Sequence, residues 1–168
     1  EAMQSVHDSI SHLRPIRIEP VNIAPRVEDA IRAAGLPEGV SVRTTGLTNL
    51  PLVRAGGSTL TLVFTNLLEN AAVAMDGRGQ VLISGSVTED WVDITVRDDG
   101  PGIPPHLHDR IFELNFSGRS AARPGKLGFG LWWVKTLMTR LGGSVAVESD
   151  GQHGAAFHLR LPRHKGTA

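Results

Sequence analysis

Three segments of this chain carry residues whose types and spacing could form a nucleotide pocket. The first contains Asn66 and Asn70, four residues apart in a run with helical periodicity. Side chains at that spacing project from one face of a helix, and Mg²⁺ favours oxygen ligands, which it shares between protein and phosphates. Asparagine is a mediocre helix former, so two of them in mid-helix call for a reason, although a solvent-facing pair would look the same. Oxygen ligation of a metal ion shared with phosphates is the functional interpretation of this pair, and two solvent-facing amides are the alternative.

The second segment is the run at 98–103, Asp-Asp-Gly-Pro-Gly-Ile, which follows a predicted strand. A carboxylate there can accept a hydrogen bond from the exocyclic amine of adenine, and the glycines let the backbone approach a flat ring. Asp98 shares the parity of Ile94 and Val96 on the strand, the inward side, whereas Asp99 points the other way. A polar turn would have a similar sequence, because Asp-Gly pairs are common in turns. We predict that Asp98 is the base-reading carboxylate.

The third segment, 125–131, has spaced glycines and leads directly into a predicted helix. Backbone amides at a helix start bind phosphate without help from side chains, and Lys126 and Arg123 could add positive charge. The segment is not a Walker motif, because the Gly-Lys-Ser/Thr ending is absent, and no strand precedes it as in a dinucleotide fingerprint. Taken alone, it would also suit a flexible connector.

Composition narrows the class of protein. The 168 residues are 40% hydrophobic, which suits one domain with one core. Basic and acidic residues balance at 17 each, so we expect no nucleic-acid partner. The absence of cysteine excludes disulfides and thiolate metal sites and fits a reducing cytosol. The apolar runs are too short to span a bilayer, so we expect a cytoplasmic domain without direct membrane contact, even if the parent protein is membrane-anchored.

Hydrophobic periodicity predicts alternating helices and strands. Two predicted hairpins and few βαβ units favour an α/β (α+β) fold, a two-layer sandwich with helices on one face of a mixed, mostly antiparallel sheet. We expect a long loop at 99–127 with one short helix at 106–112, and a disordered tail at 163–168. The predicted helices are 1–13, 22–34, 58–77 and 131–141, and the predicted strands are 17–21, 40–45, 52–55, 80–87, 91–97, 144–149 and 155–161.

Four motifs in this order resemble those of the catalytic and ATP-binding domain of sensor histidine kinases, in the GHKL superfamily. Residues 66–71 resemble the asparagine box, 96–103 the first glycine box, 111–116 the phenylalanine box and 125–131 the second glycine box. Residues 141–149 are similar to the start of the family's closing hairpin. The resemblance covers the chain from about Arg17, and four motifs in sequence make it specific where each alone is weak.

The resemblance implies a Bergerat-type sandwich that binds ATP and Mg²⁺, with a lid at about 104–127. It implies that Asn70 ligates Mg²⁺ with the help of Asn66, and that Asp98 reads the adenine amine beside Gly100 and Gly102. It implies that Gly128 and Gly130 hold phosphates. Lys126 stands where many members have glycine, so its phosphate contact is a hypothesis. The further nucleotide-binding residues that it implies are Ile103, Phe112, Arg119, Leu127, Phe129 and Leu131.

The family transfers the γ-phosphate of ATP to a histidine on a helical hairpin of its own or a partner chain, and then to a response regulator. Residues 1–14 resemble the end of the second hairpin helix, and 15–162 the catalytic domain. His7 and His12 lack the surroundings of an acceptor histidine, so we expect the acceptor outside this fragment. Because relatives dimerise through the hairpin, the resemblance implies a homodimeric parent and leaves a monomeric fragment open.

Two alternatives remain at this point. One is another GHKL enzyme, an ATPase or an anti-sigma serine kinase; the hydrolysing members usually carry a glutamate general base where Asn66 stands. The other is a nucleotide-binding module that no longer transfers phosphate.

Overall fold

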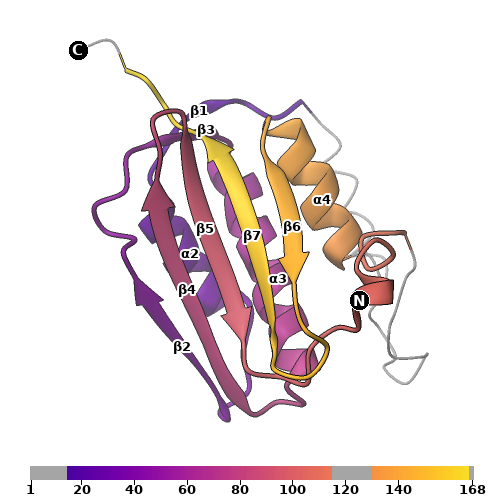
Figure 1. The fold of residues 1–168 in the computed structure, drawn as a ribbon. Helices are drawn as coiled ribbons and strands as arrows, with labels where there is room; N and C mark the ends of the chain where they lie inside the picture. The colour runs from indigo at the N-terminus through magenta and orange to yellow at the C-terminus, as the bar shows by residue number, and fades with distance from the viewer. Residues whose placement is uncertain (1–14, 115–129, 167–168) are drawn as a thin grey trace.

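The computed structural model describes residues 15–114 and 130–166, and these form two layers (Figure 1). One layer is a five-stranded sheet in the order β2 (Val40–Thr45), β4 (Gly79–Val87), β5 (Trp91–Asp98), β7 (Ala155–Pro162) and β6 (Ser144–Glu148). Strand β2 pairs in parallel with β4, and the other neighbours are antiparallel. The predicted mixed, mostly antiparallel sheet is confirmed.

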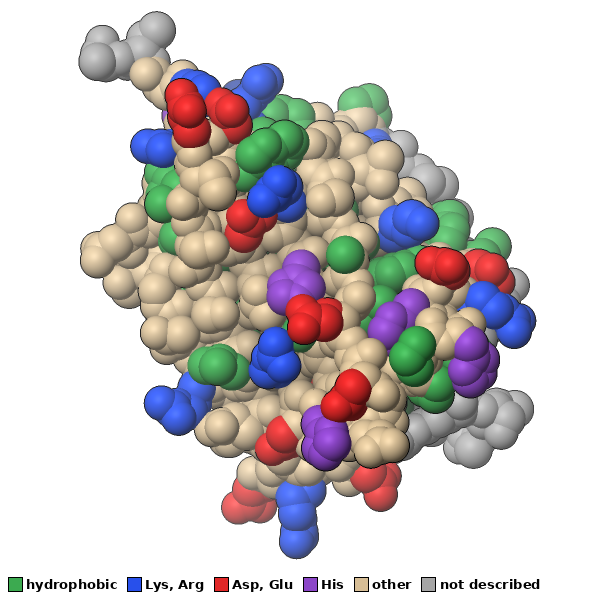
Figure 2. All heavy atoms as spheres, in the orientation of Figure 1, with side chains coloured by type: hydrophobic (Ala, Val, Ile, Leu, Met, Phe, Trp, Pro, Cys, Tyr) green, Lys and Arg blue, Asp and Glu red, His purple; other side chains and the backbone are tan. Residues whose placement is uncertain are grey.

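The second layer contains α2 (Ile23–Ala33), α3 (Gly57–Ala74) and α4 (Gly130–Arg140), which cover one face of the sheet (Figure 1). A small antiparallel sheet pairs β1 (Glu19–Val21) with β3 (Val53–Ala55). The opposite face of the large sheet is open, and acidic, basic and histidine side chains are interspersed on it (Figure 2). No helix in the described residues is long and apolar enough to cross a membrane.

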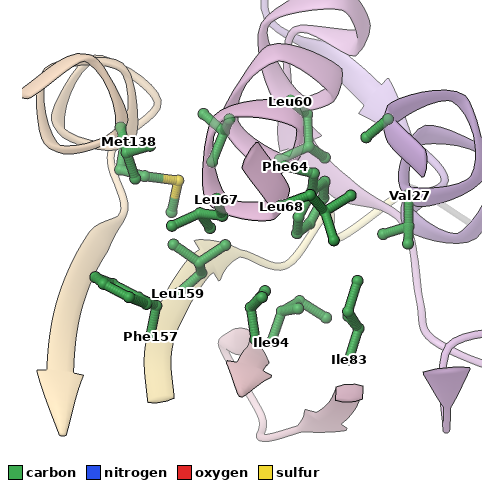
Figure 3. Close-up of a cluster of buried hydrophobic side chains, with 14 of the residues drawn as sticks. Val27, Leu60, Phe64, Leu67, Leu68, Ile83, Ile94, Met138, Phe157 and Leu159 are labelled. Carbon is green, nitrogen blue, oxygen red and sulfur yellow. The ribbon is translucent and has the colours of Figure 1, made fainter. Parts of the chain in front are cut away.

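The core lies between the layers and is centred on α3 (Figure 3). Leu60, Phe64, Leu67 and Leu68 of α3 are each at most 1% exposed, because their spacing puts them on the face that meets the sheet. The sheet contributes alternate residues, since every second side chain of a strand points to the same face. Burial on this scale is the main force that fixes α3, and therefore Asn66 and Asn70, over the sheet. The labelled partners from the other elements are Val27 of α2, Ile83 of β4, Ile94 of β5, Met138 of α4, and Phe157 and Leu159 of β7.

Two predicted helices differ from the structure in detail. The short helix predicted near 106–112 is present as the 3-10 helix η1 (Pro105–Leu107), and turns follow it through Phe112. Pro105 is the first residue of this helix, where its missing N–H would have no intrahelical partner. The helix predicted at 22–34 is α2, and the side chain of Asn22 at its start makes no capping hydrogen bond.

The first residues of the predicted disordered tail are bonded to the fold. The backbone N–H of Arg163 donates to the carbonyl of Asp90 at 2.9 Å, and that of His164 donates to the carbonyl of Leu52 at 2.8 Å. The Lys165 ammonium pairs with the Asp90 carboxylate. Residues 163–165 therefore lie between the β4–β5 turn and Leu52, the residue before β3. The predicted helix at 1–13 lies outside the described residues.

Candidate functional site

One face of α3 runs between the two parts of the predicted pocket. Asn66, Asn70 and Ala74 follow one another at intervals of four residues, so they lie along about 12 Å of one side of the helix. Both asparagines are half-buried. At one end, the amide oxygen of Asn66 is 3.8 Å from the position of a Cβ atom on Gly130, the first residue of α4. At the other end, the carbonyl of Ala74 is 3.3 Å from the position of a Cβ atom on Gly100.

This arrangement brings the first two predicted motifs and the start of α4 together. Asn70 lies on α3 between the helix start at Gly130 and the glycine turn at Gly100. Neither glycine has a side chain, so the backbone approaches α3 closely at both places. The sequence predicted the asparagine face, but the neighbours at its two ends come from segments more than twenty residues away and needed the fold.

Asp98 ends β5 with its side chain in the interior, as its parity predicted, and is 5% exposed. Its Oδ1 accepts a hydrogen bond from the Gly100 N–H at 2.9 Å. Burial raises the pKa of the Asp98 carboxyl, and the backbone N–H groups of Gly100 and Ala155 oppose that rise because they stabilise the charged form. A buried carboxylate held by two backbone donors still has lone pairs to offer a ligand.

Asp99 points away from Asp98, as predicted. Its Oδ1 accepts a hydrogen bond from the backbone N–H of Gln80 at 3.1 Å, and the residue is exposed. Asp99 therefore fastens the start of β4 to the end of β5, which is a structural task. The two neighbouring aspartates thus differ in environment, and the buried one is the candidate for ligand binding.

The turn from Gly100 to Ile103 is held by residues that the sequence did not single out. The backbone N–H of Ile103 donates to the Ser149 hydroxyl at 2.9 Å, and the carbonyl of Ile103 lies 2.9 Å from Nε2 of His108. Gly102 has a φ of 87°, in the region that favours glycine. The sequence held no signal for these contacts, because Ser149 is 46 residues from Ile103 and a lone serine after a strand is ordinary.

Two other predicted residues lie in the packed interior. Phe112 is 8% exposed, and its ring meets that of Phe157 edge to face at 6.3 Å, with the Lys135 ammonium 5.7 Å from the ring centre. Leu131, in the first turn of α4, is partly buried against the core. These contacts give both residues a packing role beside the site. Five predicted binding residues lie outside the described residues: Arg119, Lys126, Leu127, Gly128 and Phe129.

The carboxylate and amide oxygens present are compatible with an adenine nucleotide and magnesium. The buried Asp98 carboxylate offers acceptors to an amine, and a Cβ atom on Gly100 would be in tight contact with Asp98 Oδ1, at 3.0 Å. In the described residues, no group of three or more His, Cys, Asp or Glu side chains is arranged to hold a metal ion. An ion here would therefore rely on amide oxygen together with phosphate and water oxygens, which suits Mg²⁺.

A protein family and several known proteins resemble this chain. A family model described as histidine kinase-, DNA gyrase B-, and HSP90-like ATPase matches residues 56–165. The sensor protein CitS of Halalkalibacterium halodurans is 37% identical over 119 residues, which are 68% of this chain and 22% of CitS. The chain therefore spans only about a fifth of that relative's length.

Solved structures give the same result. A mycobacterial sensor histidine kinase, MprB, matches with a TM-score of 0.76 at 26% identity, over 89% of this chain and 100% of that one. Full-length ShkA in complex with AMPPNP matches with a TM-score of 0.70 at 25% identity, over 91% of this chain and 32% of ShkA. Since the matching family model includes α3, the turn at 98–103 and α4, and extends over more than half of the chain, the chain belongs to the family of histidine kinase-, DNA gyrase B-, and HSP90-like ATPases.

Proposed function

We propose that this chain is the ATP-binding catalytic domain of a sensor histidine kinase, and that it transfers the γ-phosphoryl group of ATP to a histidine on a helical hairpin outside the fragment. The observation that carries the proposal is the single face of α3 that joins the buried Asp98 turn to the start of α4. That face has a carboxylate at one end and a helix N-terminus at the other, which matches a ligand with an amine at one end and phosphates at the other.

Each residue has a defined task in this proposal. Asp98 accepts a hydrogen bond from the adenine amine, and Gly100, Gly102 and Ile103 form the wall beside the base. Asn70 ligates Mg²⁺ with Asn66 beside it, and Gly130 opens the helix that faces the phosphates. The bound ion would supply neutralisation of the phosphate charge. Phe112 and Leu131 support the site through packing. The residues Arg119, Lys126, Leu127, Gly128 and Phe129 complete the proposed phosphate side.

The protein's part in the reaction is positioning. The bond from the γ-phosphorus to the bridging oxygen of ADP breaks, and a bond from phosphorus to an imidazole nitrogen forms; the phosphoryl group then moves to a response regulator. Asn66 supports transfer over hydrolysis, because an amide cannot accept a proton from an attacking water as a general base does. The sensor kinase relatives support the same choice among the family's activities.

The test combines the domain with a chain that includes the acceptor hairpin and with Mg²⁺ and ATP labelled in the γ-phosphate. The proposal predicts label on the hairpin in an acid-labile, base-stable linkage, as expected for phosphohistidine, and far less label with Asp98→Asn. Steady release of inorganic phosphate by the domain alone, lost in Asn66→Ala, would instead indicate a hydrolysing ATPase. Nucleotide binding without label on any hairpin would indicate a binding module.

A further inference from the structure

The Ser149 hydroxyl lies where the loop after β6 meets the turn after β5. It accepts hydrogen bonds from the backbone N–H of Ile103 at 2.9 Å and of Gly151 at 3.2 Å, and it donates to the carbonyl of Gly154 at 2.6 Å. A hydroxyl has one donor and two acceptor positions, so all three are used. Ser149 thereby connects two segments that are far apart in the sequence.

The two segments are in close contact along their length. A Cβ atom on Gly102 would lie 2.8 Å from the Ser149 oxygen, and one on Gly154 would lie 2.1 Å from the carbonyl oxygen of Asp98. A Cβ atom on Gly151 would be 3.4 Å from Cα of Pro104. The loop 149–154 therefore rests against the backbone on both sides of the proposed base wall, and the Ser149 hydroxyl is the side-chain group at the centre of that contact.

A second contact holds the same turn at the carbonyl of Ile103. His108 Nε2 lies 2.9 Å from the Ile103 carbonyl oxygen, and the backbone N–H of Gly100 donates a hydrogen bond to the Asp98 carboxylate. Ile103 is thus held at its N–H by Ser149 and at its carbonyl by His108. Loss of the Ser149 bond would free the N–H side of Ile103 while Asp98 kept its own backbone donors.

We infer that Ser149 is a positioning residue for the adenine site: through the Ile103 N–H it fixes the 100–103 wall relative to Asp98. Ser149 touches no ligand in this role. The inference rests on the proposed function, because it assigns the wall to the nucleotide base. It adds the β6–β7 loop, which lies outside the four nucleotide-binding motifs, to the parts that determine base selectivity.

The test compares Ser149→Ala with Ser149→Thr, which retains a hydroxyl, and with Ser144→Ala, an exposed serine at the other end of β6. We measure the affinities for ATP and GTP and the melting temperature of each variant. We expect Ser149→Ala to weaken ATP binding roughly tenfold, equivalent to about 1.4 kcal/mol, and to reduce the ratio of ATP to GTP affinity. Ser149→Thr should recover most of both, and Ser144→Ala should match the wild type.

A readout at the hydrogen bond itself separates positioning from general stability. Amide exchange of Ile103 should accelerate in Ser149→Ala far more than exchange of core amides such as Ile94. If Ser149→Ala does not fold, Ser149→Cys takes its place, since sulfur is a weak acceptor. If the Ala or Cys variant binds ATP with the affinity and selectivity of the wild type, the role of Ser149 is overturned, whereas the proposed function still holds. Absence of ATP binding by the wild type overturns the proposed function and this inference with it.

Discussion

The amide oxygen of Asn66 lies 3.8 Å from the point that a Cβ atom would occupy on Gly130. Residue 130 begins α4, so the middle of α3 meets the start of α4 with no side chain on the α4 residue. Eight residues further along α3, the carbonyl of Ala74 meets the Gly100 turn in the same way. These two contacts define the length and direction of the candidate site.

Asp98→Asn should weaken ATP binding roughly ten- to a hundredfold, because a hydrogen bond to a charged group contributes about 1.5–3 kcal/mol. The change keeps the size of the side chain, so the fold should remain, as judged by circular dichroism. Asp99→Asn is the matched control, since Asp99 is exposed and bonds to the Gln80 backbone. Calorimetric titration of ATP into both variants checks this. Equal affinities in the two would remove Asp98 from the base site.

The affinity for ATP should depend on pH through Asp98. Burial raises the pKa of this carboxyl, so it takes up a proton at a higher pH than an exposed aspartate does. The ionised form accepts a hydrogen bond from the adenine amine, so the affinity should be highest above the raised pKa and should fall as the pH drops through it. Asp98→Asn lacks a titrating carboxyl at this position. The difference between its pH profile and that of the wild type therefore reports the titration of Asp98 separately from that of the ATP phosphates. Parallel profiles would contradict the assignment.

Asp150 should titrate near pH 2 in the wild type. The His153 side chain, and then the backbone N–H groups of Gln152 and His153, lower the pKa of the Asp150 carboxyl to about 2. Because this pKa lies below the value of about 3.9 in an unfolded chain, the contribution to stability is present above pH 3.9 and is lost as the pH falls towards 2.

Replacement of the histidine tests that cause. His153→Ala should raise the Asp150 pKa, but leave it below the ordinary value because the backbone donors remain. His158→Ala is the control, since His158 bonds to Glu148 and Thr95 instead. NMR titration of the carboxyl carbons reports each value. An unchanged Asp150 pKa in His153→Ala would show that the backbone alone determines it.

Two glycine substitutions should affect different properties, the free energy of unfolding in one case and the nucleotide affinity in the other. Gly102→Ala should lower the free energy of unfolding by about 1–3 kcal/mol, because Gly102 has a φ of 87° and a Cβ atom there would lie 2.8 Å from the Ser149 oxygen. Gly130→Ala should leave stability nearly unchanged, because 3.8 Å to Asn66 is an ordinary contact. Its methyl group should nevertheless reduce nucleotide affinity beside the asparagine face. Urea unfolding and ATP titration of both variants measure these effects, and similar stabilities would contradict the turn geometry.

The sequence predicted the local parts of the site, because local periodicity determines them. The spacing of Asn66 and Asn70 placed both on one helix face, and the period of two along β5 put Asp98 inside and Asp99 outside. The hydrogen bond from the Ile103 N–H to the Ser149 hydroxyl could not be predicted, because it depends on how two distant loops meet after the sheet has formed. The segment predicted as a short helix near 106–112 is helical only over Pro105–Leu107, and Phe112 beyond it packs against Phe157 of β7.

The most direct test of the central claim is a titration of ATP into the wild type and Asn70→Ala, each with and without Mg²⁺. If the α3 face joins a base site to a magnesium and phosphate site, the wild type binds ATP more tightly with Mg²⁺. Asn70→Ala should lose most of that gain and keep the affinity measured without Mg²⁺, because Asp98 is unchanged. The same gain with Mg²⁺ in both proteins, or no binding by the wild type at millimolar ATP, would contradict the account.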